Sequence, residues 1–255
     1  MKTFITNRNS DQISVVVENE NGSESKLAFV MHGLSGNKEE PHLRGMVGVL
    51  KSSGYSVVTW DAVHTFGESK GGSYEDATIT NYYADLEDVV AWASQQAWYV
   101  EPFVLVGHSL GGISTALYAE KYPEKVKALA PISTVVNGEL RMESKAEITE
   151  EWKRTGYHTE KRSNGGTKTL KWSHMEDNMQ YDITKDAEKL TMPVLLVVGS
   201  EDTSTKPKHQ QIFYDSLTTD KELHVIDGAE HTFYRSHERE ELNQVLKTWL
   251  KNKVN

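Results

Sequence analysis

The pentapeptide Gly-His-Ser-Leu-Gly at 107–111 is the part of the chain best suited to nucleophilic chemistry. It lies between an apolar run at 103–106, which predicts a strand, and an alanine-rich segment at 113–121, which predicts a helix. A sharp turn between them would expose the hydroxyl of Ser109, and the flanking glycines would avoid steric overlap there. The alternative is a purely structural role, in which a glycine-rich turn leads into the helix and the serine caps its N-terminus. The context favours Ser109 as the nucleophile of an acyl-transfer reaction.

A serine nucleophile needs a general base, and the base needs a carboxylate that orients it. Asp202 directly follows an apolar strand pattern and is the predicted acid, with its neighbour Glu201 as the alternative. His231 lies in a loop between a strand pattern and the last helix pattern, and it is the predicted base. His108 is a poor candidate, because its side chain cannot easily turn back onto the adjacent serine. The order of serine, acid and histidine along the chain agrees with a strand-turn-helix nucleophile.

Two backbone N–H groups would stabilise the negative oxygen of a tetrahedral intermediate. Leu110, the residue after the nucleophile, is expected to supply one, and Leu34 in the glycine-containing loop after an earlier strand is expected to supply the other. His32 could be mistaken for a ligand or a base, and we expect it to brace this loop through hydrogen bonds. No spacing of histidines and carboxylates typical of a metal site occurs, so neither a metal nor another cofactor is expected.

Periodic apolar patterns predict the elements that must position these residues. A turn is expected at 19–22, and a loop rich in glycine and serine at 62–76. The predicted strands are 4–6, 13–18, 26–31, 55–60, 103–106, 126–131, 193–198 and 222–226, and the predicted helices are 41–52, 81–96, 113–121 and 237–250.

Strands that alternate with helices indicate an α/β protein with a mostly parallel sheet flanked by helices. Sites in such sheets form at the carboxyl ends of the strands. Residues 1–133 and 191–255 are predicted to form this core, and 134–190 to form a lid insertion over the site. The alternative is a surface subdomain with its own small core. The large apolar residues of the insertion that we expect to contact the substrate are Trp152, Trp172, Met175 and Tyr181.

Composition narrows the possible partners. The 255-residue chain has a net charge of −9 and no visible basic stripe, which argues against nucleic acid. It contains no cysteine, so disulfides, thiolate metal sites and a cysteine nucleophile are excluded. No apolar run reaches the length of a membrane span, and a cytoplasmic location is expected, although a secreted form whose signal had been removed would look the same. A small-molecule substrate is expected, and a homodimer is left open.

The motifs His32-Gly33, Gly107-His-Ser-Leu-Gly-Gly112, Gly199-Ser-Glu-Asp202 and Gly228-Ala-Glu-His231 occur in this order. Together they resemble the α/β-hydrolase superfamily over nearly the whole chain. Within it, the sequence is similar to bacterial carboxylesterases of the cinnamoyl/feruloyl esterase type and to monoacylglycerol-lipase-like enzymes. The resemblance implies an α/β-hydrolase fold with a lid insertion, the triad of Ser109, Asp202 and His231, and the oxyanion donors Leu34 and Leu110.

Two features depart from these relatives. The segment that follows Asp61 replaces their compact D-x-x-G-x-G-x-S loop, and Leu110 stands where many feruloyl-type relatives have Gln.

The motifs and the resemblance together predict a serine carboxylic-ester hydrolase with an acyl-enzyme intermediate, acting on small or aromatic acyl esters. The alternatives are a thioesterase, an amidase or aminopeptidase-like hydrolase, or an acyltransferase with the same triad. A non-enzymatic alternative is a hydrolase-fold binding protein.

Overall fold

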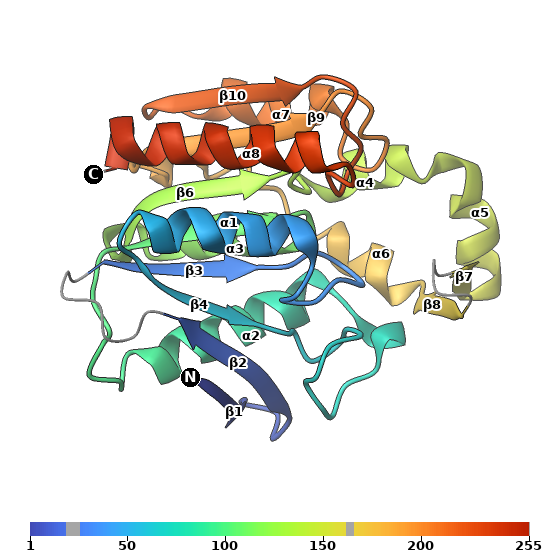
Figure 1. Cartoon of the computed structure of the whole chain (residues 1–255). Helices are drawn as coiled ribbons and strands as arrows, with labels where there is room; N and C mark the ends of the chain where they lie inside the picture. The colour runs from blue at the N-terminus through green and yellow to red at the C-terminus, as the bar shows by residue number, and fades with distance from the viewer. Residues whose placement is uncertain (19–25, 162–165, 255) are drawn as a thin grey trace.

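The computed structural model describes residues 1–18, 26–161 and 166–254, and within them eight strands form one sheet (Figure 1). The spatial order is β1-β2-β4-β3-β5-β6-β9-β10. The pairs β1–β2 and β2–β4 are antiparallel, and all other neighbours in this sheet are parallel. The mostly parallel sheet that the sequence predicts is confirmed. The strands are β1 (Lys2–Thr6), β2 (Gln12–Glu18), β3 (Leu27–Met31), β4 (Ser56–Trp60), β5 (Phe103–His108), β6 (Val126–Ile132), β9 (Val194–Gly199) and β10 (Lys221–Ile226).

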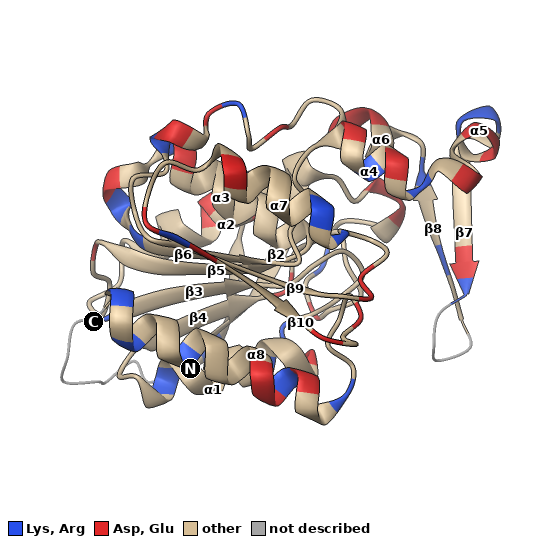
Figure 2. Cartoon of the chain, turned by 90° about the horizontal axis from the view of Figure 1, so that it is seen from above, with Lys and Arg blue, Asp and Glu red and all other residues tan. Residues whose placement is uncertain are grey.

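Helices cover both faces of the sheet. Figure 2 shows α1 and α8 on one face and α2, α3 and α7 on the other. No helix in the described part of the chain is long and apolar enough to cross a membrane. The main helices are α1 (Pro41–Ser52), α2 (Ile79–Ala93), α3 (Leu110–Lys121), α7 (Pro207–Ser216) and α8 (Ser236–Trp249), and short 3₁₀ turns are η1 (Tyr74–Asp76), η2 (Pro123–Lys125) and η3 (Ala187–Lys189), with a π-helical end η4 (Leu250–Val254).

The buried strands supply side chains to two apolar layers, one on each face of the sheet. Successive side chains of a strand point to opposite faces. In β5, Phe103 and Leu105 belong to the layer under α2 and α3, whereas Val104 and Val106 belong to the layer under α1 and α8. Because both faces are covered, the central strands read as continuous apolar runs, and the sheet forms a rigid support for the loops at its ends.

Most predicted elements are found within a few residues of their expected bounds. Helix α1 spans Pro41–Ser52, as predicted. Helix α3 begins at Leu110 rather than at residue 113, because the turn at Ser109 leads directly into the helix. The turn predicted at 19–22 lies outside the described residues.

The described residues of the insertion between β6 and β9 form three α-helices, the 3₁₀ turn η3 and a separate two-stranded hairpin. Figure 1 shows it beside the carboxyl ends of the parallel strands. Its buried residues Trp152, Leu170 and Met175 belong to the same apolar cluster as α2, α3 and the sheet. The insertion thus shares the main core, and its role as a lid stays a prediction. Its elements are α4 (Gly138–Ser144), α5 (Ala146–Thr155), β7 (Tyr157–Lys161), β8 (Thr167–Lys171) and α6 (Ser173–Asn178).

Glu120 is an unusual residue in the last turn of α3. Its side chain is buried, and its Oε1 has no hydrogen-bond partner among the described residues. Burial raises the pKa of Glu120 to about 8, and the nearby Asp186 adds to the effect. The folded chain therefore keeps Glu120 protonated at neutral pH.

We predict that Glu120→Gln stabilises the protein at high pH and has little effect at low pH. In the unfolded chain Glu120 ionises near its usual pKa of 4.5, whereas in the fold it holds its proton up to about 8. The parent therefore loses stability as pH rises through this window, and the glutamine variant does not. Urea unfolding at about pH 8 should give a gain on the order of 4 kcal/mol.

The matched control is Glu124→Gln, which changes an exposed glutamate in η2. Its free energy of unfolding should follow the parent at both pH values. A constant difference between Glu120→Gln and the parent across this pH range would contradict a buried, protonated Glu120.

Candidate active site

The turn between β5 and α3 holds Ser109 in a strained backbone conformation. Ser109 has φ of 55° and ψ of −112°, and a positive φ is rare for a residue with a side chain. A β-carbon at Gly107 would overlap the carbonyl group of Gly111. A β-carbon at Gly111 would lie 2.5 Å from the carbonyl oxygen of His32 at the end of β3. Both glycines are therefore required for the turn to form against the neighbouring strand.

The structure brings Ser109, His231 and Asp202 together from three separate loops. The Oγ of Ser109 lies 3.0 Å from Nε2 of His231, and Nδ1 of His231 lies 2.7 Å from Oδ2 of Asp202. Since the carboxylate can only accept, Nδ1 carries the imidazole proton and Nε2 is free to accept the serine proton. This is the arrangement that activates a serine hydroxyl.

Asp202 is held by its own loop and is buried. The backbone N–H groups of Ser204 and Thr205 each donate to Oδ1 at 2.9 Å, and the Thr205 hydroxyl donates to Oδ2 at 2.9 Å. Burial alone would raise the pKa of Asp202, but His231 and Thr205 hold it well below its usual value. Glu201, the alternative acid, is exposed and makes no side-chain contact to the histidine among the described residues.

Two neutral histidines lie behind His231. Nε2 of His108 donates to the backbone oxygen of His231 at 2.8 Å, which ties the loop of His231 to the turn at Ser109. The ring of His42 packs on that of His108 with centroids 4.4 Å apart. Burial lowers the pKa of His108 well below its usual value and that of His42 to about 3. Both rings therefore add no charge next to His231 at neutral pH.

The loop after β3 lies against Ser109. A β-carbon at Gly33 would lie 2.9 Å from Cβ of Ser109. The predicted bracing by His32 is confirmed, because its Nδ1 donates to the Gly33 oxygen at 2.7 Å and its Nε2 accepts from the N–H of Ala62 at 2.9 Å. In the described chain, the N–H groups of Leu34 and Leu110 donate to no other protein group. Both are thus available to an oxyanion.

A buried ion pair fixes the far side of this loop. The ammonium of Lys38 donates to Asp61 at 2.6 Å and to Glu68 at 2.7 Å, and its backbone N–H donates to Asp61 at 2.8 Å. Lys38 and Asp61 are only 2% and 1% exposed. Burial alone would lower the pKa of Lys38, but the two carboxylates raise it. The segment after Asp61 folds back tightly, because a β-carbon at Gly67 would overlap the Asp61 carboxylate.

A cavity of about 220 Å³ opens at Ser109 and is called the inner cavity here. Of the four apolar residues expected to contact substrate, Trp152 lines it. Met175 is fully buried in the core instead, and the Tyr181 hydroxyl lies 2.6 Å from that of Thr80. Trp172 supports Trp152 edge to face, with ring centroids 5.9 Å apart. A smaller cavity of about 110 Å³ lies on the other side of Ser109 and is lined by Leu34, His42 and His108.

The inner cavity also contains charged residues that the sequence did not single out. Arg141, Lys145, His158, Glu160 and Lys168 from the insertion all line it. The sequence treats them as ordinary solvated charges, because nothing in their local pattern separates a cavity wall from an outer surface. No group of three or more histidines and carboxylates within the described residues could hold a metal ion.

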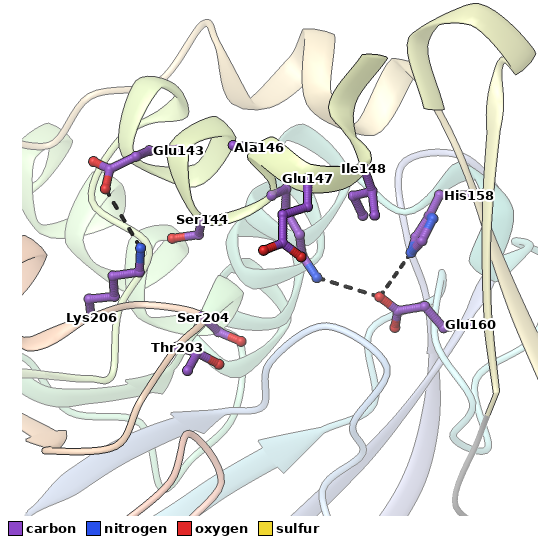
Figure 3. A pocket seen from close by; sticks show the side chains of 11 residues that line it. Glu143, Ser144, Ala146, Glu147, Ile148, His158, Glu160, Thr203, Ser204 and Lys206 are labelled. Carbon is purple, nitrogen blue, oxygen red and sulfur yellow. Dashed lines mark hydrogen bonds and ion pairs between the residues drawn. The ribbon is translucent and has the colours of Figure 1, made fainter. Parts of the chain in front are cut away.

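A larger cavity of about 640 Å³, called the outer cavity, adjoins the inner one and shares Lys145, His158, Glu160 and Ser204 with it. Figure 3 shows its mixed lining, with an ion pair between Glu143 and Lys206 on one side and His158 bonded to Glu160 on the other. The insertion and the loop after β9 therefore form its two walls (Figure 3).

Comparison with known proteins gives the family. A family model described as serine aminopeptidase, S33, matches residues 23–180 and 141–239. The solved structure of Est1E from Butyrivibrio proteoclasticus with ferulic acid bound superposes with a TM-score of 0.79 and 21% identity, over 99% of both chains. This likeness shows that the chain has the α/β-hydrolase fold.

Two curated relatives match shorter stretches. Norfluorocurarine synthase 1 from Strychnos sp is 31% identical over 125 residues, which are 47% of this chain and 42% of that protein. Probable esterase PIR7A from Oryza sativa subsp. indica is 36% identical over 83 residues, which are 32% of this chain and 30% of that protein. The match thus spans less than half the length of these relatives.

We predict that Lys38→Met lowers the free energy of unfolding by about 3 kcal/mol, because it leaves the buried Asp61 carboxylate unpaired. The control is Lys2→Met, which removes the other ion pair of Glu68. Lys2 and Glu68 are 52% and 49% exposed, so this loss should stay below about 1 kcal/mol. Urea unfolding measures both, and equal losses would show that burial does not set the strength of the Lys38 pair.

Proposed function

Because the chain belongs to the serine aminopeptidase S33 family and has the α/β-hydrolase fold, we propose that it is a serine hydrolase that cleaves carboxylic esters. The observation that carries the proposal is the pair of contacts that joins Ser109 to His231 and His231 to Asp202, at 3.0 Å and 2.7 Å. The strained conformation of Ser109 supports it further, because such strain is typical of a residue whose exposure serves chemistry.

The proposed reaction has two halves. In the first, Ser109 Oγ attacks the ester carbonyl carbon while Nε2 of His231 takes the hydroxyl proton. The oxyanion is held by the N–H groups of Leu34 and Leu110, and the positive end of α3 adds to this stabilisation. The ester bond then breaks, His231 protonates the departing alcohol, and an acyl group remains on Ser109.

In the second half, water attacks the acyl carbon and His231 accepts one of its protons. The second tetrahedral intermediate uses the same two N–H donors. Its collapse returns the proton from His231 to Ser109 and releases the carboxylic acid. Asp202 keeps the imidazole in the required tautomer and stabilises its positive charge throughout.

An ester fits the cavity better than an N-terminal peptide does. An aminopeptidase has to bind the free ammonium of its substrate, which calls for an unpaired carboxylate near the nucleophile. The one carboxylate that lines the inner cavity within the described residues is Glu160, and it already pairs with Lys145 and Lys168. Glu40 lines the smaller cavity on the other side of Ser109 and has no side-chain partner among the described residues, so an aminoacyl substrate is included in the assay below. Thioester hydrolysis and acyl transfer to another alcohol use the same triad, and the assay below separates thioesters from esters.

We also propose that the insertion acts as a lid that selects the acyl or alcohol group. The support is that the inner cavity has Ser109 and His231 on its core side and Trp152 and Leu170 on its insertion side. Trp152 is fixed by its Nε1 donating to the Leu170 oxygen at 3.1 Å. The core supplies the reacting groups, and the insertion supplies the surface that meets the rest of the substrate.

We predict that Ser109→Ala lowers ester hydrolysis by about 10⁴-fold or more and abolishes labelling by a fluorophosphonate probe. The assay compares 4-nitrophenyl acetate, methyl ferulate, an acetyl thioester and an aminoacyl anilide. Ser94→Ala, at an exposed serine after α2, is the control and should keep full activity. If the Ser109→Ala variant folds and retains more than about a tenth of the rate, Ser109 is not the nucleophile.

We predict that Asp202→Asn lowers kcat by about 10³- to 10⁴-fold, because an amide at this position favours the wrong tautomer of His231. Glu201→Gln should change kcat by less than about twofold, since the Glu201 side chain is exposed. Steady-state kinetics on 4-nitrophenyl acetate measures both variants. The opposite ranking would transfer the role of the acid to Glu201.

A further inference from the structure

The inner cavity is positively charged although the whole chain carries a net charge of −9. Arg141, Lys145 and Lys168 line it, and Glu160 is the carboxylate among its described lining residues. The outer cavity is mixed instead, because it adds Glu143 and Glu147 as well as Lys206 to the residues it shares. Of these two cavities, the inner one beside Ser109 has the excess of positive charge.

Glu160 does not neutralise this excess. Its carboxylate lies 3.4 Å from the ammonium of Lys145, 3.2 Å from that of Lys168 and 3.0 Å from Nε2 of His158. Burial alone would raise the pKa of Glu160, but these neighbours lower it to about 2, so it is ionised and fully engaged. Lys168 is held further by the Ser35 hydroxyl at 3.3 Å.

Arg141 has no such partner. Among the described residues its guanidinium makes no hydrogen bond or ion pair, and its Nε is buried. Burial lowers the pKa of Arg141, which means that its charge is poorly solvated. The other described arginines are either paired, as Arg8, Arg44 and Arg235 are, or held by backbone oxygens, as Arg239 is, or exposed, as Arg154 is.

Arg141 is partly buried. Holding an unpaired cation away from bulk water is costly, and the cost is recovered if a ligand brings an anion to it. A guanidinium presents parallel N–H donors that match the two oxygens of a carboxylate. We propose that the natural substrate is an ester that carries a carboxylate, and that Arg141 binds this carboxylate in the inner cavity. The inference rests on the proposed function of Ser109, and it adds the substrate class.

Two matched pairs of esters test the proposal and locate the carboxylate. The first pair is 4-nitrophenyl hydrogen adipate and 4-nitrophenyl methyl adipate, which differ in a charge on the acyl side. The second pair is 4-acetoxybenzoate and 4-acetoxybenzamide, which differ in a charge on the alcohol side. We expect kcat/KM of the anionic member to exceed that of its neutral partner by about tenfold or more in one pair, and the preference to shrink with added salt.

Arg141→Gln should lower this anionic-to-neutral ratio by about 10- to 100-fold, the range expected for a charge-assisted hydrogen bond. Arg141→Lys should keep part of the preference, because the charge stays and the paired donors are lost. Arg154→Gln makes the same change in net charge at an exposed position of the insertion and should leave the ratio unchanged.

The outcomes separate the two proposals. If 4-nitrophenyl acetate is hydrolysed but neither pair shows a preference, or if Arg141→Gln keeps the ratio within about twofold, the carboxylate assignment is wrong and the esterase proposal stands. If no ester is hydrolysed, the esterase proposal fails. If no ester is hydrolysed, or if Arg141→Gln does not fold, the carboxylate assignment is tested by calorimetric titration of Ser109→Ala with monomethyl adipate. Dimethyl adipate is the control. Saturable binding of the anion alone supports the assignment, and its absence overturns it.

Discussion

The site depends on one steric constraint, the turn that forces Ser109 into a positive φ. This turn forms only if no side chain intervenes between β5, α3 and the end of β3, and Gly107 and Gly111 meet that condition. The backbone N–H of Ser109 donates to the oxygen of Ile132 at 2.9 Å, which ties the turn to β6 as well. The register of three parallel strands therefore sets the position of Ser109, and strain at this residue is supported by the centre of the sheet.

The loops that complete the site are attached to this centre by polar contacts between buried groups. Lys38 and Asp61 join the loop after β3 to the end of β4, and His108 joins the turn to the backbone of His231. The imidazoles behind the site are neutral, because burial lowers the pKa of both His108 and His42. With neutral rings behind it, His231 has the Asp202 carboxylate as its charged hydrogen-bond partner, as the proposed proton transfer from Ser109 requires.

The core and the insertion make opposite electrostatic contributions at Ser109. The core supplies the buried carboxylate of Asp202, two neutral histidine rings and backbone N–H donors. None of these groups distinguishes one ester from another. From the insertion come Arg141, Lys145 and Lys168, with Glu160 engaged by the two lysines. In the proposed function, chemistry and recognition are carried by separate parts of the chain, so that sequence change in the insertion would alter the substrate without disturbing the sheet.

The sequence by itself determined the sheet, the main helices and the identity of the residues that meet at Ser109. Their signals are local, since an apolar run, a helical period or a glycine beside a serine can be read from neighbouring positions. Only the tertiary structure decided which residues of the insertion line the cavity at Ser109. Met175 is large and apolar yet packs into the core, whereas Arg141 is charged yet lines the cavity. The sequence of a short charged helix such as α4 is the same whether the helix faces water or a cavity. The cavity exists only because the hairpin of β7 and β8, which is distant in the sequence, folds back to line it as well.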